Sequence, residues 1–269
     1  MMTRRARRAA LVAVGAALFA GNAHGGPPRD GPYGGRPSTL RILAYNVRHG
    51  AGMDDVVDLT RAARVIRELQ PDVVALQEID DRTTRTDGVD QAARLGELTG
   101  MHAAFGAFMD YAGGEYGMAL LSKYPLSDVT NHRLPDGAEP RSALAARIRP
   151  GDPAPEVVIV GIHLYRSAEE RLAQAQRIVD IFQDERAAVI LIGDFNSTPD
   201  SPVISLLART WAIPDKGTDH LTFPSDDPSR EIDYIMFRPT DRFEVVALDV
   251  IDEPLASDHR PVLLELRWR

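Results

Sequence analysis

Residues that can bind a metal or transfer a proton stand directly beside apolar runs that predict strands. They are Asn46 after 40–45, Glu78 after 73–76, His163 after 157–162, Asp194 and Asn196 after 189–192, and Asp258 and His259 before 262–266. Loops at one edge of a sheet form its usual crevice, and an antiparallel strand starts at the edge where its neighbours end. Carboxylates, imidazoles and amides that converge there suit a divalent metal with oxygen ligands and acid–base chemistry.

Each of these residues also has an ordinary structural interpretation. An Asn or Glu after a strand is commonly a turn former or surface group, and His163 could be a hydrogen-bonded core residue. Asp194 and Asn196 could bond their own backbone in a tight turn. Asp233 is harder to explain, because it lies within the apolar run 232–237 and a buried carboxylate needs a partner. The joint occurrence in this order favours the functional interpretation.

The elements that must position these residues alternate between strand and helix patterns. Apolar runs predict strands at 40–45, 73–76, 116–121, 143–148, 157–162, 189–192, 232–237, 243–250 and 262–266, and periodic patterns predict helices at 59–69, 89–98 and 169–184. Both helices and hairpins connect these strands, so the sheets must be mixed rather than purely parallel. No internal repeat and no second domain boundary is evident.

The composition excludes several classes of protein. With 269 residues, of which 44% are hydrophobic and 26% charged, the chain is not intrinsically disordered and can bury a sizeable core. It contains no cysteine, which excludes disulfides, thiolate metal sites and a cysteine nucleophile. The formal net charge is -8, although the N-terminal 24 residues carry four arginines and no acidic residue. The remainder, with a net charge of -12, lacks the broad basic footprint of a protein that binds long nucleic acid.

The N-terminus has the pattern of an export signal. Four arginines precede the apolar stretch 9–20, which is shorter than the ~18 residues of a membrane span, and Gly21 and Ala23 offer small side chains to a signal peptidase. We therefore expect a signal peptide at 1–23 and export to the periplasm or the extracellular space. A short buried helix is the alternative. The Gly- and Pro-rich residues 24–37 predict a spacer before a domain at 38–269.

Taken in order, the motifs resemble those of the endonuclease/exonuclease/phosphatase superfamily, the DNase I-like metal-dependent phosphohydrolases. The strings that carry the resemblance are Asn46, Gln77-Glu78, Tyr116-Gly117, His163, Gly193-Asp194-Phe195-Asn196, Thr222-Phe223, Ile232-Asp233-Tyr234 and Ser257-Asp258-His259-Arg260-Pro261. The resemblance implies an α/β four-layer sandwich, with two mixed β-sheets packed face to face and flanked by helices. It also implies Mg²⁺- or Mn²⁺-assisted cleavage of a phosphoester.

The same resemblance implies which residues hold the metal and activate water. Glu78 is similar to the principal metal ligand of the family, with Asn46 and Asp258 completing or orienting the metal shell. Asp194 is similar to the group that orients or deprotonates the attacking water. Such a reaction needs charge neutralisation by the metal and by fixed donors, together with a base for the water.

Five further residues are implied to act on the phosphate. Asn196 and His163 are expected to donate hydrogen bonds to the phosphate oxygens, and Tyr116 is expected to make a further phosphate contact. His259, held by Asp233, is similar to a histidine that contacts the scissile phosphate or assists proton transfer. An Asp behind an imidazole fixes its tautomer and stabilises its protonated form.

Two arginines are candidates for substrate binding. Arg85 lies in the segment 81–90, and Arg141 ends the string Glu139-Pro140-Arg141; both segments are similar to specificity loops of the smaller secreted relatives. A solvated charged surface is the alternative for both segments.

The acidic charge and low aromatic content favour a small or lipid-headgroup phosphodiester as substrate over nucleic acid. A nuclease is the alternative, because arginines such as Arg82 and Arg166 could gather around one groove. We expect a monomer with no stable membrane insertion. Two other classes are a glycoside hydrolase, which would use Asp194 with Asp258 or Glu78 and need no metal, and a non-catalytic binding module on the same fold.

Overall fold

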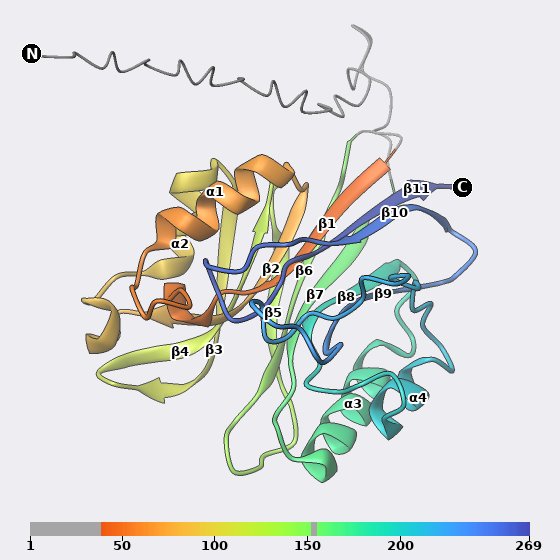
Figure 1. Cartoon of the computed structure of the whole chain (residues 1–269). Coiled ribbons are helices and arrows are strands. Elements are labelled where there is room, and N and C mark those ends of the chain that lie inside the picture. The colour runs from red at the N-terminus through yellow and green to blue at the C-terminus, as the bar shows by residue number, and fades with distance from the viewer. Residues whose placement is uncertain (1–38, 152–154) are drawn as a thin grey trace, which may run out of the picture.

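Two mixed β-sheets form the centre of the molecule, and the computed structural model describes residues 39–151 and 155–269. The sheets pack face to face, with two helices outside each (Figure 1). The helices are α1 (Leu59–Leu69) and α2 (Gln91–Thr99) outside one sheet, and α3 (Ala168–Phe182) and α4 (Pro202–Leu207) outside the other. The predicted four-layer sandwich of two mixed sheets is therefore confirmed.

The two sheets differ in size and in their sequence of strands. The six-stranded sheet has the order β10 (Phe243–Val250), β11 (Val262–Trp268), β1 (Thr39–Asn46), β2 (Val73–Asp81), β4 (Gly114–Ser122) and β3 (His102–Tyr111). The five-stranded sheet has the order β5 (Ser127–Arg133), β6 (Ser142–Ile148), β7 (Val157–His163), β8 (Ala188–Asp194) and β9 (Asp233–Arg238). Within these described sheets, β1–β2 and β7–β8 are the parallel pairs and the remaining pairs are antiparallel.

The central strands are apolar on both faces, because both faces of each sheet are covered. On β1, Ile42 and Ala44 face the opposite sheet, whereas Leu43 and Tyr45 pack beneath α1 and α2. The same division separates the two faces of β8, whose outer face packs against α3 and α4. This double coverage explains why the sequence shows continuous apolar runs rather than an alternation of apolar and polar residues.

The strand pairing carries the polar strand ends to one edge of the sandwich. Asn46 at the end of β1 lies opposite Gln77 of β2, and His163 at the end of β7 lies opposite Asp194 of β8. The antiparallel strand β9 begins there with Asp233 opposite Asp194. The register thus produces the convergence that the sequence analysis expected.

Among the described strands and α-helices, β3, β5 and α4 were not predicted from the sequence. The residues of β5 are nearly all exposed at the edge of the sheet, so their sequence has no periodic apolar signal. β3 is likewise an edge strand with mostly exposed or half-buried residues. α4 has six residues, which is too short for a helical period to be recognised.

The predicted export signal at 1–23 and spacer at 24–37 lie outside the described residues. Among the residues that are described, no helix combines the length and the apolar character needed to cross a membrane.

Candidate active site

A cavity of about 540 Å³ opens at the edge where the polar strand ends meet. Its wall includes Glu78, Arg85, Tyr116, Arg141, His163, Asp194, Asn196, Asp258 and His259. Asn46 and Asp233 are buried behind this wall, where Asn46 contacts Glu78 and Asp233 contacts His259. The structure therefore brings together every residue predicted for the site, while the role of each residue stays a prediction.

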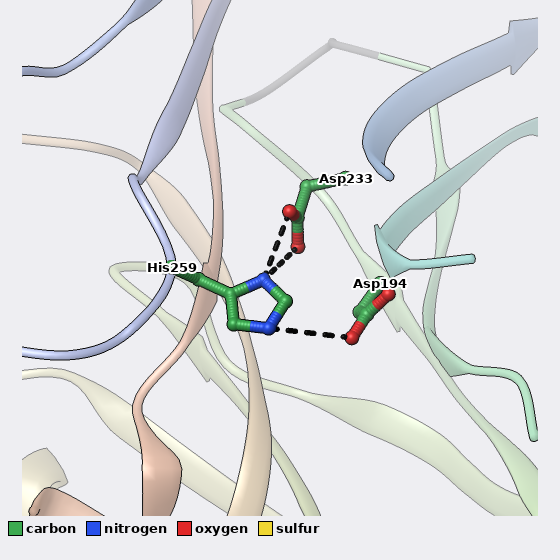
Figure 2. Close-up of side chains that lie close together, drawn as sticks. All are labelled: Asp194, Asp233 and His259. Carbon is green, nitrogen blue, oxygen red and sulfur yellow. Dashed lines mark hydrogen bonds and ion pairs between the residues drawn. The ribbon is translucent and has the colours of Figure 1, made fainter. Parts of the chain in front are cut away.

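His259 lies between two carboxylates (Figure 2). Its Nδ1 is 3.0 Å from Oδ2 of Asp233, and its Nε2 is 3.8 Å from Oδ2 of Asp194. Burial by itself would lower the pKa of His259, but the charges of Asp233 and Asp194 outweigh burial and raise that pKa to about 10. The imidazole is therefore a cation at neutral pH, with Nδ1–H held by Asp233 and Nε2–H directed toward the side of Asp194.

Local contacts fix this pair in place. Thr222 Oγ1 accepts a hydrogen bond from the backbone N–H of Asp233 at 3.3 Å, at the start of β9. The ring of Phe223 packs on the imidazole of His259 with a centroid distance of 4.8 Å. Ser257 Oγ donates to the backbone carbonyl at the end of β1 at 2.7 Å, which ties the loop before β11 to the strand that carries Asn46. These loop contacts thus anchor Asp233 and His259 next to each other.

Glu78 occupies a β-bulge in β2. The pairing of β2 with β4 shifts between Gln77 and Ile79, and the backbone of Glu78 has a φ of 60°. A bulge takes one residue out of the regular ladder and changes the direction of its side chain. Burial raises the pKa of Glu78 and the neighbouring charge of Asp258 raises it further, against a hydrogen bond from Asn46 Nδ2 at 3.1 Å.

Asp194 ends β8 at a point where the two neighbouring backbones come very close. A Cβ at Gly193 would lie 2.1 Å from the carbonyl oxygen of Ile162 and 2.6 Å from Nε2 of Gln77, and φ there is 144°. Glycine is therefore required immediately before the carboxylate. Burial raises the pKa of Asp194, and the charge of Asp233 raises it further. A carboxylate with a raised pKa is better suited to accept a proton near neutral pH.

Asn196 orients the Asp194 carboxylate. Its backbone N–H donates to Oδ1 of Asp194 at 2.7 Å, and its Nδ2 donates to the carbonyl of Leu164 at 2.9 Å and lies 3.4 Å from Oδ2 of Asp194. Both hydrogens of this amide therefore already point toward protein acceptors. Its predicted hydrogen bond to a phosphate oxygen stays a prediction.

His163 is held by a chain of buried polar contacts. Glu139 Oε1 pairs with Nη2 of Arg141 at 2.7 Å, and Nη1 of Arg141 lies 3.4 Å from Nδ1 of His163. An arginine can only donate, so Nδ1 accepts and the ring proton is on Nε2, which lies 3.5 Å from Oδ2 of Asp194. Burial and the charge of Arg141 hold the pKa of His163 well below its usual value. Arg141 is buried, so the alternative of a solvated surface is wrong for this residue.

Arg85 reaches the cavity from the loop after β2. Its Nε and Nη2 donate to the two oxygens of the buried Asp80 at 2.7 Å each. Its guanidinium carbon lies 4.6 Å from the ring centre of Tyr111 and 5.4 Å from that of Tyr116. Burial raises the pKa of Tyr116, so its hydroxyl stays protonated and can donate. The charge of Arg85 is largely neutralised by Asp80, which weakens the case for direct substrate binding.

The donor set fits the metal that the resemblance implies. Within the described ranges, neither Glu78 nor Asp258 has an ion-pair partner, although both face the cavity. Two such carboxylates are unfavourable together unless a cation binds, and oxygen donors suit Mg²⁺ or Mn²⁺. Asp194, Asp233 and His259 form a second possible metal group, with ligand atoms within 4.8 Å of one another. There, however, the hydrogen bond between His259 and Asp233 already occupies one imidazole nitrogen.

The cavity wall also contains residues to which the sequence analysis gave no part in the site. Arg171 lies in the first turns of α3, eight residues after His163, and Arg230 lies three residues before Asp233. Phe223, noted only as part of a motif, packs directly on His259. In the sequence, only their proximity to a motif could have indicated that these arginines belong to the site. This signal is weak, because arginines in such positions are usually solvated.

Comparisons with known proteins find relatives that match most of this chain. The uncharacterized protein YbhP of Escherichia coli strain K12 is 23% identical over 248 residues, which cover 85% of this chain and 96% of YbhP. The crystal structure of an endonuclease/exonuclease/phosphatase from Beutenbergia cavernae is 26% identical, with a TM-score of 0.69 over 86% of this chain and 72% of that chain.

More distant solved structures share the fold. A mannosyl-6-phosphatase of Bacteroides thetaiotaomicron is 17% identical, with a TM-score of 0.69 over 85% of this chain and 100% of that chain. The human nocturnin catalytic domain, solved with a bound sulfate anion, is 20% identical, with a TM-score of 0.65 over 88% of this chain and 96% of that chain. The model of the Endonuclease/Exonuclease/phosphatase family matches residues 43–259, which run from β1 through His259. The chain therefore belongs to the endonuclease/exonuclease/phosphatase family.

Proposed function

We propose that this protein is a metal-dependent phosphodiesterase that hydrolyses a small or lipid-headgroup phosphodiester. The observation that carries the proposal is the position of His259, a buried cation between Asp233 and Asp194 at the wall of the cavity. A buried imidazolium with a free N–H, beside a carboxylate of raised pKa, provides both a donor for a phosphate oxygen and a base for water.

In this proposal, Glu78, Asn46 and Asp258 would hold Mg²⁺ or Mn²⁺, and the bound ion would offset the negative charge of the phosphate. Asp194 orients a water molecule and accepts its proton as the water oxygen attacks phosphorus. As the new bond to phosphorus forms, the bond from phosphorus to the leaving oxygen breaks, and the leaving oxygen keeps the electron pair and takes a proton from solvent to depart as an alcohol.

The remaining groups act as fixed donors to the phosphate. His259 donates from Nε2 to a phosphate oxygen, while Asp233 stabilises its charge. His163 donates from Nε2, because Arg141 occupies its Nδ1. Asn196, Tyr116, Arg85 and Arg141 are the further candidate contacts to the substrate.

The test is a panel of substrates assayed with Mg²⁺ and with excess EDTA: bis-p-nitrophenyl phosphate, phosphatidylinositol, sphingomyelin and plasmid DNA. We expect hydrolysis of bis-p-nitrophenyl phosphate that EDTA abolishes and Mg²⁺ or Mn²⁺ restores. His259→Ala should lower kcat ~10²–10⁴-fold. The exposed His102, which lies away from the cavity wall, provides the matched control His102→Ala.

The outcomes of this panel separate the alternatives. Activity confined to DNA would favour the nuclease. Hydrolysis of glycosides at a rate that EDTA does not change would favour a glycoside hydrolase, which uses a pair of carboxylates and no metal. Binding of phosphoesters without turnover in any metal would favour a non-catalytic module.

We also propose that the protein is exported after cleavage near Ala23 and acts as a monomer without stable insertion into a membrane. The basic and apolar pattern of residues 1–23 supports export.

A further inference from the structure

The wall of the cavity is unusually rich in arginine for an acidic protein. The formal net charge of the chain is -8, yet five arginines line this one cavity: Arg85, Arg141, Arg166, Arg171 and Arg230. Arg85 is neutralised by Asp80, and Arg141 is neutralised by Glu139. The other three have no ion-pair partner within 4.0 Å among the residues that the structure describes.

Arg171 is the most constrained of these three arginines. Its Nη1 donates to the backbone carbonyl of Arg166 at 2.5 Å, which fixes the Arg171 side chain against the loop between β7 and α3. Its Nε is buried and has no hydrogen-bond partner among the described atoms. Burial lowers the pKa of Arg171, and the charge of Asp194 compensates for only part of that shift. A buried, unsatisfied N–H on a charged group is costly, and an anionic acceptor would relieve that cost.

Arg230 lies in another part of the wall. Its guanidinium packs 4.6 Å from the ring centre of Phe223, and that ring in turn packs on His259. Arg230 is thus next to the group that we propose for the scissile phosphate. Arg166 and Arg171 come from the segment after His163 and do not take part in that stack. Their charges come in addition to the donors already assigned to the scissile phosphate, and neither has an ion-pair partner among the described residues.

We propose that Arg166 and Arg171 form a subsite for a second anionic group, chemically a phosphate, carried by the same small substrate whose phosphoester is cleaved. The subsite rests on the proposed function in one respect, because the proposal assumes that the scissile phosphate lies near His259. Both residues line the same cavity, and guanidinium groups bind phosphate through charge-assisted hydrogen bonds. The same charges disfavour a choline headgroup, because its quaternary ammonium is a cation. The substrate is therefore a bisphosphorylated small molecule rather than a phosphocholine lipid.

Binding of matched nucleotides tests this subsite without any need for turnover. Calorimetry in Mg²⁺ would compare adenosine 5′-monophosphate with adenosine 2′,5′- and 3′,5′-bisphosphate. We expect at least one bisphosphate to bind ~10–100-fold more tightly than the monophosphate, as charge-assisted hydrogen bonds of this kind provide. Arg171→Gln and Arg166→Gln should each remove most of that gain, and Arg171→Lys should retain part of it. Thermal unfolding of each variant checks that it is folded.

The matched control is Arg177→Gln, since Arg177 is exposed on the same helix and does not line the cavity. It should keep the full preference for the bisphosphate. Equal affinities for the monophosphate and both bisphosphates in the wild type would overturn the subsite. So would a preference that survives both Arg166→Gln and Arg171→Gln. Faster hydrolysis of p-nitrophenyl phosphorylcholine than of bis-p-nitrophenyl phosphate would also contradict it.

Binding of a ten-nucleotide single strand of DNA tests whether the second phosphate belongs to a nucleic acid or to a small molecule. If it binds more tightly than either bisphosphate and through the same arginines, the assignment to a small molecule is wrong. Failure of the proposed function looks different. In that case, bis-p-nitrophenyl phosphate is not hydrolysed in any metal, while the preference for the bisphosphate and its loss in Arg171→Gln remain.

Discussion

The arrangement around His259 shows how a buried carboxylate can determine the protonation state of a neighbouring imidazole. Asp233 lies in an apolar strand, and its ion-pair partner among the described residues is this imidazole. Burial opposes the charge on the imidazole, whereas Asp233 and Asp194 favour it, and the raised pKa of His259 shows that the carboxylates prevail. We therefore expect the pair to act as one functional unit, in which a mutation of either residue affects both.

A double-mutant cycle tests that unit. Asp233→Asn should lower kcat without changing the circular dichroism spectrum, because the imidazole loses its anionic partner and can adopt the wrong tautomer. In the double variant that combines Asp233→Asn with His259→Ala, the loss of kcat should be close to that of His259→Ala alone, because no imidazole remains for Asp233 to orient. The measurement is kcat for bis-p-nitrophenyl phosphate at saturating Mg²⁺. Fully multiplicative losses would mean that the two residues act independently.

A second prediction concerns the metal ligand. Glu78→Gln keeps the size of the side chain but removes the carboxylate that the bulge in β2 directs into the cavity region, so Mg²⁺ affinity and activity should both fall. Titration calorimetry with Mg²⁺ measures the affinity directly. Glu68→Gln, on the exposed face of α1, is the control and should bind Mg²⁺ like the wild type. Unchanged Mg²⁺ affinity in Glu78→Gln would remove Glu78 from this role.

At the scale of the element, the ends of β7 and β8 and the bulge in β2 place the charged groups. The strands β7 and β8 run parallel, so their last residues, His163 and Asp194, arrive at the same edge. β2 continues past that edge to Asp81, and the bulge at Glu78 shifts its pairing with β4. The close approach at Gly193 allows Asp194 to stay near both neighbouring strands.

Gly193→Ala should therefore damage both stability and activity. The new Cβ would lie 2.1 Å from a backbone carbonyl oxygen, in a backbone conformation that L-residues rarely adopt. This strain should lower the free energy of unfolding by about 2–5 kcal/mol. Urea unfolding measures the change. The control is Gly161→Ala on β7, where the Cβ would meet the flexible end of Met118 at 3.3 Å and the effect should be small. Equal stabilities of the two variants would contradict the steric argument.

At the scale of the whole molecule, two sheets pack face to face with helices on their outer sides (Figure 1). The cavity is lined by residues from the strand ends and loops at one edge of this sandwich. The two halves contribute different parts of the site. The six-stranded sheet and its loops provide Asn46, Glu78 and His259, whereas the five-stranded sheet provides His163 and Asp194. The site therefore depends on the packing of one sheet against the other.

Processing of the N-terminus is the prediction that belongs to the whole chain. Mass spectrometry of the protein produced in a bacterial host with its full sequence should find a mature form that begins close to residue 24, in the exported fraction. Replacement of the four arginines at positions 4, 5, 7 and 8 by Gln should reduce export, because the basic region precedes the apolar stretch. Recovery of intact protein that begins at Met1 in the exported fraction would contradict the signal peptide.

The sequence by itself determined the strands that end in polar residues, because continuous apolar runs mark strands buried on both faces and abrupt polar ends mark their edges. The order of the motifs also indicated the family and the residues of the site. The edge strands β3 and β5 could not be recognised, because exposed strands are defined by their pairing rather than by their side chains. Only the tertiary structure decided the charge states of His259 and His163, since opposite shifts of their pKa values arise from partners distant in the chain, Asp233 and Arg141. It also decided which arginines are already neutralised and which remain free, because pairing depends on distances in space that residue spacing along the chain does not contain.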